Sequence, residues 1–261
     1  MNRFMVAAMV MSVVSGCGSS GPGATANPTQ DPPPSQTPTP SATPSIQDIW
    51  GFEPLAPIGP GTYFIDPDLD PATPLRVVYE IPVEGWSMWI GATKLAEEGH
   101  VSMSITTVVN LVRDGCRDHS WADPPVGPSV NDLVAALADL APFRVTSPPK
   151  DVTIYGYRGK HLELTVPDLP VEEGGDNRVE DPELSFTECI DGNLKSWVAP
   201  IDTAEEGDAF YGYTGPSYSE EFWILDVEGT RLMIAAERSP GSPAADLAEL
   251  RAILDSIRIE P

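Results

Sequence analysis

The residue types best suited to chemistry lie close together between positions 116 and 123. Cys116, Asp118, His119 and Asp123 all fall in this stretch, and a histidine beside carboxylates can act as a general base. One hypothesis is therefore a hydrolase site around His119 and Asp123. The alternative interpretation is a structural histidine in a loop that a disulfide closes. A serine or carboxylate hydrogen-bonded to His119 inside a concave pocket would favour the enzyme.

The N-terminus resembles an export signal that ends at a cysteine. Residues 4–14 are apolar apart from one serine and follow Arg3, and this run is too short to span a bilayer as a helix. Val14-Ser15-Gly16-Cys17 then places two small residues before a cysteine, as in the lipobox of bacterial lipoproteins. This pattern predicts a signal peptide over residues 1–16 and a lipidated Cys17 that carries acyl chains such as palmitate. The alternative is an ordinary secretory signal with an incidental cysteine.

The segment after Cys17 has the composition of a tether. Residues 18–45 contain eight prolines and ten serines or threonines, and Asp31 is their single charge. Such a segment cannot form a hydrophobic core, so we expect residues 17–45 to be a disordered linker. The combination of a lipid anchor and a long tether predicts a cell-membrane protein on the extracytoplasmic face, because acyl chains together anchor a protein stably.

The remaining residues, 46–261, are long enough for one domain with a hydrophobic core. The whole chain has 15 Lys and Arg against 39 Asp and Glu, and its formal net charge is −24. A surface this acidic repels phosphate backbones, so we expect no nucleic-acid partner.

Two cysteines remain in the exported part. An even pair in an oxidising compartment predicts a disulfide between Cys116 and Cys189. The sequence Cys116-Arg117-Asp118-His119 also has the spacing of a metal site. No second pair of ligands follows at a suitable spacing, so we expect neither a metal nor a cofactor there. Two free thiols are the third possibility.

Aromatic residues in a glycine-rich stretch are candidates for binding a ligand. Residues 202–219 are expected to form a loop that carries Tyr211, Tyr213 and Tyr218. Exposed aromatic side chains on such a loop would suit a carbohydrate or an apolar ligand, and His119 and Trp121 are further candidate contacts. The alternative is that these tyrosines simply anchor the loop.

Calcium binding is weakly indicated. Residues 66–70 begin like a calcium-binding EF-hand loop, but Pro71 and Val77 replace the required glycine and glutamate. Other acidic stretches could bind calcium loosely, although solvated loops are the default interpretation. These stretches are Glu172–Glu173, Asp181–Glu183 and Glu205–Asp208.

Hydrophobic periodicity predicts more strands than helices. The expected strands cover residues 61–65, 76–82, 86–92, 101–109, 184–190 and 194–198, with hairpins over 152–166 and 222–236. In the first hairpin the return strand should place His161, Glu163 and Thr165 on its outward face. One helix should begin at Ser129 with a capping-box-like pair to Asp132, and a second should begin at Ser242-Pro243. The expected fold class is α+β, a single domain with an antiparallel sheet and two packed helices.

Several stretches together resemble a group of exported actinobacterial proteins, many of them lipoproteins, whose function is uncharacterised. The resemblance rests on Gly61–Tyr63, Pro82–Trp86, Trp121–Pro128, Gly156–Leu164, Phe222–Gly229 and Ser256–Ile259. It spans nearly all of residues 46–261, and no catalytic residues come with it. In its order of elements the chain is also similar to the Mog1/PsbP-like fold, an antiparallel sheet flanked by helices.

These observations favour a lipid-anchored binding or interaction module of the cell envelope that is not an enzyme. Its partner would be an envelope protein, a small molecule or a carbohydrate. The alternatives are the hydrolase near His119 and a carrier of an apolar ligand, which would need an apolar cavity between sheet and helix.

Overall fold

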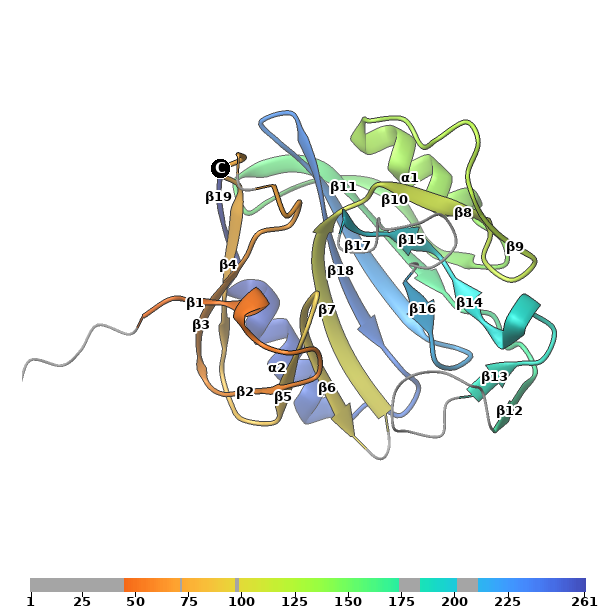
Figure 1. Cartoon of the computed structure of the whole chain (residues 1–261), viewed down its shortest axis with the longest axis horizontal. Coiled ribbons are helices and arrows are strands. Elements are labelled where there is room, and N and C mark those ends of the chain that lie inside the picture. The colour runs from red at the N-terminus through yellow and green to blue at the C-terminus, as the bar shows by residue number, and fades with distance from the viewer. Residues whose placement is uncertain (1–44, 71, 97–98, 174–183, 201–210) are drawn as a thin grey trace, which may run out of the picture. The chain divides into compact units, whose positions relative to one another are not determined.

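The computed structural model describes residues 45–261 except 71, 97–98, 174–183 and 201–210 (Figure 1). The signal peptide, Cys17 and the tether up to residue 44 lie outside the described residues, as do Asp181–Glu183 and Glu205–Asp208. The described residues belong to one compact unit. Within the described part, neither helix is long and apolar enough to cross a bilayer.

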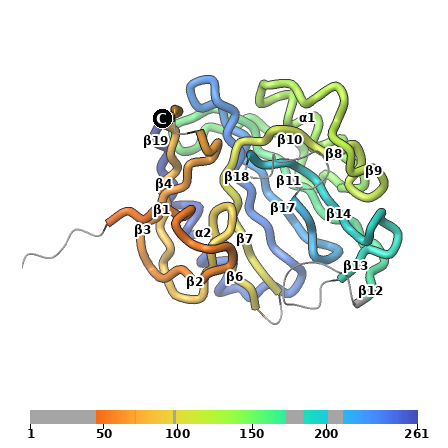
Figure 2. Tube along the Cα trace, in the orientation of Figure 1, coloured from red at the N-terminus to blue at the C-terminus, as the bar shows by residue number. Residues whose placement is uncertain are grey.

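The fold is α+β, and most of its strands are antiparallel. In spatial order, the largest sheet contains eight strands: β10 (Arg144–Ile154), β11 (Tyr157–Thr165), β17 (Ser219–Val227), β18 (Thr230–Arg238), β7 (Gly99–Thr107), β6 (Gly91–Ala96), β5 (Trp86–Trp89) and β2 (Pro57–Ile58). The helices are α1 (Val130–Asp139) and α2 (Ala244–Asp255), with short 3-10 turns at η1 (Ile49–Gly51) and η2 (Ile190–Gly192). Figure 2 follows the same chain as a continuous tube.

The single sheet expected from the sequence is instead several sheets. A four-stranded sheet contains β1 (Gln47–Asp48), β3 (Gly61–Ile65), β4 (Arg76–Ile81) and β19 (Arg258–Glu260). A three-stranded sheet contains β15 (Trp197–Val198), β8 (Asn110–Asp114) and β9 (Asp118–Trp121). Two further pairs are β12 (Val171–Glu173) with β13 (Leu184–Phe186), and β14 (Leu194–Lys195) with β16 (Gly212–Tyr213). Strands β12 and β16 lie inside stretches that the sequence predicted as loops.

Glycine and turn geometry explain where one predicted strand is broken and where a predicted hairpin turns. The expected strand over 86–92 is broken before Gly91, which has a φ of 141° and packs so close to the Met103 carbonyl that a Cβ would collide with it. The hairpin predicted over 152–166 turns at Tyr155-Gly156, because Ile154 and Tyr157 are already paired. Both turn residues have positive φ, as a two-residue primed turn requires.

The two helices begin where capping chemistry allows. Ser129 caps α1, and the full capping box with Asp132 is present, as predicted. Helix α2 begins one residue later than expected, because Pro243 occupies the N-cap position and Ala244 is the first helical residue. The helix is tied to strand β6 by Lys94, whose ammonium lies 2.6 Å from both Asp246 and Glu249.

Strand alternation gives the eight-stranded sheet two faces, each with one helix. Arg231 of β18 donates to the Ser129 carbonyl at 3.4 Å and also to the Gly127 carbonyl, so α1 lies on its face, here called the α1 face. Lys94 points to the opposite side and bonds to α2, which defines the α2 face. The strands β8, β9, β14, β15 and β16, here called the covering strands, lie on the α1 side (Figure 1).

Candidate functional site

Two buried glutamates face each other on the α1 face. Glu220 on β17 and Glu237 on β18 are direct cross-strand partners, and they are only 3% and 4% exposed. Like charges directly opposite each other destabilise a sheet, and a buried charge is costly unless it is paired. Among the described residues, Glu220 Oε1 and Glu237 Oε2 are buried without a hydrogen-bond partner. The fold therefore retains an acidic pair that opposes its own stability.

Glu220 holds its proton more tightly than an ordinary glutamate. Its pKa is raised well above the usual value by burial and, next, by the negative charge of Glu237. The Tyr213 hydroxyl lies within hydrogen-bond distance of Glu220 Oε2 and of Ser196 Oγ, at 3.2 Å from the latter. The Tyr213 hydroxyl donates to the Glu220 carboxyl and thereby lowers its pKa, but burial and the charge of Glu237 outweigh this effect. The Trp197 indole N–H approaches the same carboxyl without reaching hydrogen-bond geometry.

Glu237 is bonded to a histidine. His100 Nε2 lies 2.8 Å from Glu237 Oε1, and His100 Nδ1 lies 3.4 Å from the Tyr218 hydroxyl. The His100 and Tyr218 rings meet edge to face with centroids 5.0 Å apart. The backbone N–H of His100 donates to Ser239 Oγ at 2.7 Å. The imidazole is thus fixed on both ring nitrogens, while Glu237 Oε2 remains unbonded.

The tyrosines predicted to be exposed on a loop are instead part of the covering layer. Tyr211 and Tyr213 are 7% and 6% exposed, and Tyr218 is half-buried. Tyr211 stacks on Trp197 with centroids 4.3 Å apart and meets Tyr213 edge to face. The pKa values of Tyr211 and Tyr213 are raised above their ordinary value, first by burial and then by the two carboxylates, so both phenols are neutral. The hypothesis that Tyr211 and Tyr213 are exposed on the surface was therefore wrong. Both side chains lie near Glu220 and Glu237.

A pocket of about 130 Å³ opens beside Glu237. Its walls are mainly apolar, and Glu237, His100 and Ser102 are among the polar residues that line it. The lining residues are Leu55, Trp89, Thr93, Leu95, His100, Ser102, Tyr211, Gly212, Thr214 and Glu237. A concave apolar site with a few convergent polar groups is the usual form of a small-molecule site.

A larger hollow of about 350 Å³ between α1 and β11 is less suited to a ligand. Two of its three cations, Lys160 and Arg231, already have partners: Lys160 lies 2.7 Å from Asp151, and Arg231 donates to backbone carbonyls.

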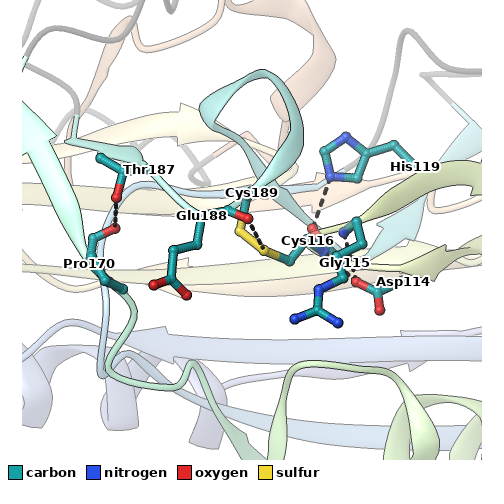
Figure 3. The surroundings of a disulfide bond; sticks show 9 residues. Asp114, Gly115, Cys116, His119, Pro170, Thr187, Glu188 and Cys189 are labelled. Atoms are coloured by element: carbon teal, nitrogen blue, oxygen red, sulfur yellow. Dashed lines mark hydrogen bonds between the residues drawn. A yellow bond between two sulfur atoms is a disulfide. The ribbon is translucent and has the colours of Figure 1, made fainter.

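The disulfide between Cys116 and Cys189 is present, as predicted (Figure 3). Cys116 lies in the turn between β8 and β9, and Cys189 directly precedes η2. The bond therefore joins the β8–β9 turn to the segment between β13 and η2, and the two cysteines are 73 residues apart in the sequence. Oxidised Cys116 is not available as a thiolate ligand, which removes the metal interpretation of its spacing to His119.

His119 has the surroundings of a structural histidine. Its Nε2 lies 2.9 Å from the Gly115 carbonyl (Figure 3), and its pKa is lowered mainly by burial. Among the described residues no serine or carboxylate is hydrogen-bonded to the ring, and Asp123 is an exposed side chain 3.8 Å from Arg113. The half-buried Trp121 has an indole nitrogen without a described partner. Neither His119 nor Trp121 lines the pocket.

Comparison with protein-family models, with curated proteins and with solved structures finds no match for this chain. The resemblance to exported actinobacterial lipoproteins and to the Mog1/PsbP-like fold therefore stays a prediction.

The sequence analysis overlooked His100, Glu220 and Glu237, although a signal for the two glutamates was present. The hairpin was expected over 222–236 with a turn at Glu228-Gly229. Phe222 pairs with Ala235 in this register. Two residues further along each strand, on the same face of the sheet, Glu220 lies opposite Glu237. Acidic residues on a face that is otherwise apolar are an unusual and informative pattern.

Proposed function

We propose that residues 46–261 form a non-enzymatic binding module, displayed on the outer face of a membrane by a lipidated Cys17 and the Pro/Ser/Thr-rich tether. The observation that supports binding is the pocket lined by Glu237, because the buried Oε2 of this residue has no described hydrogen-bond partner. A buried acceptor that lacks a donor is costly, so a ligand that supplies one gains more affinity there than at the surface.

The pocket chemistry favours a small molecule with an apolar body and a cationic amine. Trp89, Leu55 and Leu95 offer apolar contact area, and each buried methylene contributes about 0.8 kcal/mol. The buried Glu237 carboxylate repels an anion and attracts a cation. A primary ammonium can donate to the Glu237 carboxylate after a small movement of that side chain, while the alkyl chain follows the apolar wall.

The histidine geometry supports binding rather than catalysis. His100 Nε2 is bonded to Glu237 and Nδ1 faces Tyr218, so neither nitrogen is paired with Ser102 on the same strand. A nucleophile and its base need such a hydrogen bond. The hydrolase alternative near His119 and Asp123 gains no support from their hydrogen bonds.

We expect the purified protein to bind n-hexylamine at least tenfold more tightly than n-hexanol or hexanoate in calorimetric titrations. Glu237→Gln should remove that preference, because it removes the charge and keeps the shape of the side chain. Glu80→Gln, at an exposed site 3.4 Å from Arg258, is the matched control and should bind as the unmodified protein does. Equal affinity for all three probes, or unchanged amine preference in Glu237→Gln, would contradict the proposal.

The anchor is tested separately. Cys17→Ala removes the thiol that would carry the acyl chains, so the protein should move from the membrane fraction to the soluble fraction on cell fractionation. Cys116→Ala, which changes a cysteine of the disulfide, should leave membrane retention intact. Membrane retention of Cys17→Ala would refute lipidation at this residue.

A further inference from the structure

A histidine and two glutamates converge on the α2 face of the eight-stranded sheet, opposite the pocket. His161 and Glu163 are two residues apart on β11 and therefore point to the same side. Glu221, on the neighbouring strand β17, is the direct cross-strand partner of Glu163. The ligand atoms of these three side chains all lie within 4.8 Å of one another.

We infer that His161, Glu163 and Glu221 form a binding site for a divalent transition-metal ion such as Zn²⁺. Nε2 of His161 lies 3.6 Å from Oε2 of Glu221. Ligands about 2.1 Å from a tetrahedral zinc ion are about 3.4 Å apart, so small side-chain movements suffice to coordinate it. The position of all three residues on two paired strands fixes their backbones relative to one another.

The surroundings of the three residues suit a cation. Glu163 and Glu221 are like charges placed directly opposite each other, which is unfavourable without a counter-ion. Among the described residues the Glu163 carboxylate has no hydrogen bond or ion pair, whereas Glu221 Oε1 is 3.3 Å from Arg238 Nη1. Arg238 thus occupies one oxygen of Glu221 and leaves Oε2 directed at His161. A bound cation would neutralise the remaining repulsion.

The histidine is held in an orientation suited to coordination. Its ring packs against Trp223 with centroids 5.2 Å apart, and only 17% of its side chain is exposed. A ring that packing already holds in place loses little freedom when it binds a metal ion. The side chain expected from the sequence to lie on the surface is therefore largely covered.

The donor set selects among metals. One imidazole nitrogen with two carboxylate oxygens suits Zn²⁺ and neighbouring transition metals, whereas calcium requires six to eight oxygen ligands. Three protein ligands leave one tetrahedral position for water or for a donor atom of another molecule. Because this face is opposite the pocket, the inference holds whether or not the pocket binds an amine.

The test is calorimetric titration of the purified, chelator-treated full chain with Zn²⁺ and, separately, with Ca²⁺. We expect one saturable Zn²⁺ site per chain and a raised unfolding midpoint, with almost no shift of the midpoint in Ca²⁺. His161→Ala and the isosteric Glu163→Gln should each weaken Zn²⁺ binding at least tenfold. His119→Ala and Glu80→Gln are the matched controls for an imidazole and a carboxylate elsewhere, and they should bind as the unmodified chain does.

Spectroscopy keeps the test decisive if a variant folds poorly. With Zn²⁺ bound to the unmodified chain, X-ray absorption should show one imidazole nitrogen and carboxylate oxygens as ligands. Binding that does not saturate, a ligand shell without nitrogen, or equal Zn²⁺ affinity in His161→Ala would each overturn the inference, because the acidic surface alone would then explain the binding.

Discussion

The double variant Cys116→Ser/Cys189→Ser should unfold at a much lower urea concentration than the unmodified protein. The two cysteines are 73 residues apart in the sequence, and closing a loop of that size removes about 4 kcal/mol of unfolded-state entropy in the chain-entropy model. This is a large part of the 5–15 kcal/mol that usually stabilises a folded protein. The measurement is the midpoint of urea unfolding at neutral pH.

Loss of the disulfide should also weaken ligand binding in the pocket, because the disulfide stabilises the backbone next to the covering strands. The Ile190 N–H donates to the Cys116 carbonyl at 2.8 Å, and the Lys195 N–H donates to the Gly115 carbonyl at 2.9 Å. One residue further on, Ser196 and Trp197 are hydrogen-bonded through their backbones to Tyr211, which lines the pocket. We therefore expect weaker binding of n-hexylamine by the double variant.

Cys17→Ser is the matched control, because it replaces a cysteine outside this crosslink. Its unfolding midpoint should equal that of the unmodified protein. A double variant that unfolds at the same urea concentration as this control would show that the crosslink adds nothing to the stability of the domain.

Glu220→Gln should increase stability at neutral pH and flatten its dependence on pH. In the folded protein the pKa of Glu220 is raised by burial and by Glu237, so the folded state binds this proton more tightly than the unfolded state does. The stability is therefore fully present below the unfolded-state pKa of glutamate and is lost as pH rises toward the folded-state pKa. Within that window each pH unit costs about 1.4 kcal/mol. Glutamine does not ionise, so the variant should lack this slope.

Urea unfolding between pH 4.5 and pH 8 measures both curves. The two proteins should converge at the acid end and separate as pH rises. Glu80→Gln serves again as the control, because an exposed substitution usually changes stability by less than about 0.5 kcal/mol. Parallel curves for Glu220→Gln and the unmodified protein would mean that Glu220 is ionised in the folded state throughout this range.

Local sequence patterns predicted the elements whose formation depends on near neighbours. The capping box at Ser129 and Asp132 starts α1, and the two-residue turn at Glu228-Gly229 joins β17 to β18. Strand β9 was missed, although its partner β8 directly precedes it. Strands β8 and β16 were also missed, because they are short and pair with β15 and β14, which are not their neighbours in the sequence. The burial of Tyr211 has the same cause, since its partner Trp197 lies across a segment with no periodic pattern.

The sequence by itself determined the α+β class, both helices, the disulfide and, through the register of one hairpin, the encounter of Glu220 with Glu237. Capping and turn geometry depend on residues close together in the sequence. The disulfide follows because Cys116 and Cys189 are the two cysteines that remain once Cys17 is assigned to the anchor. Only the tertiary structure decided that β11 pairs with β17, and so that His161 and Glu163 meet Glu221. It also placed His100 and Tyr211 around Glu237. Pairing between strands more than fifty residues apart depends on the packing of the whole core, which no local pattern encodes.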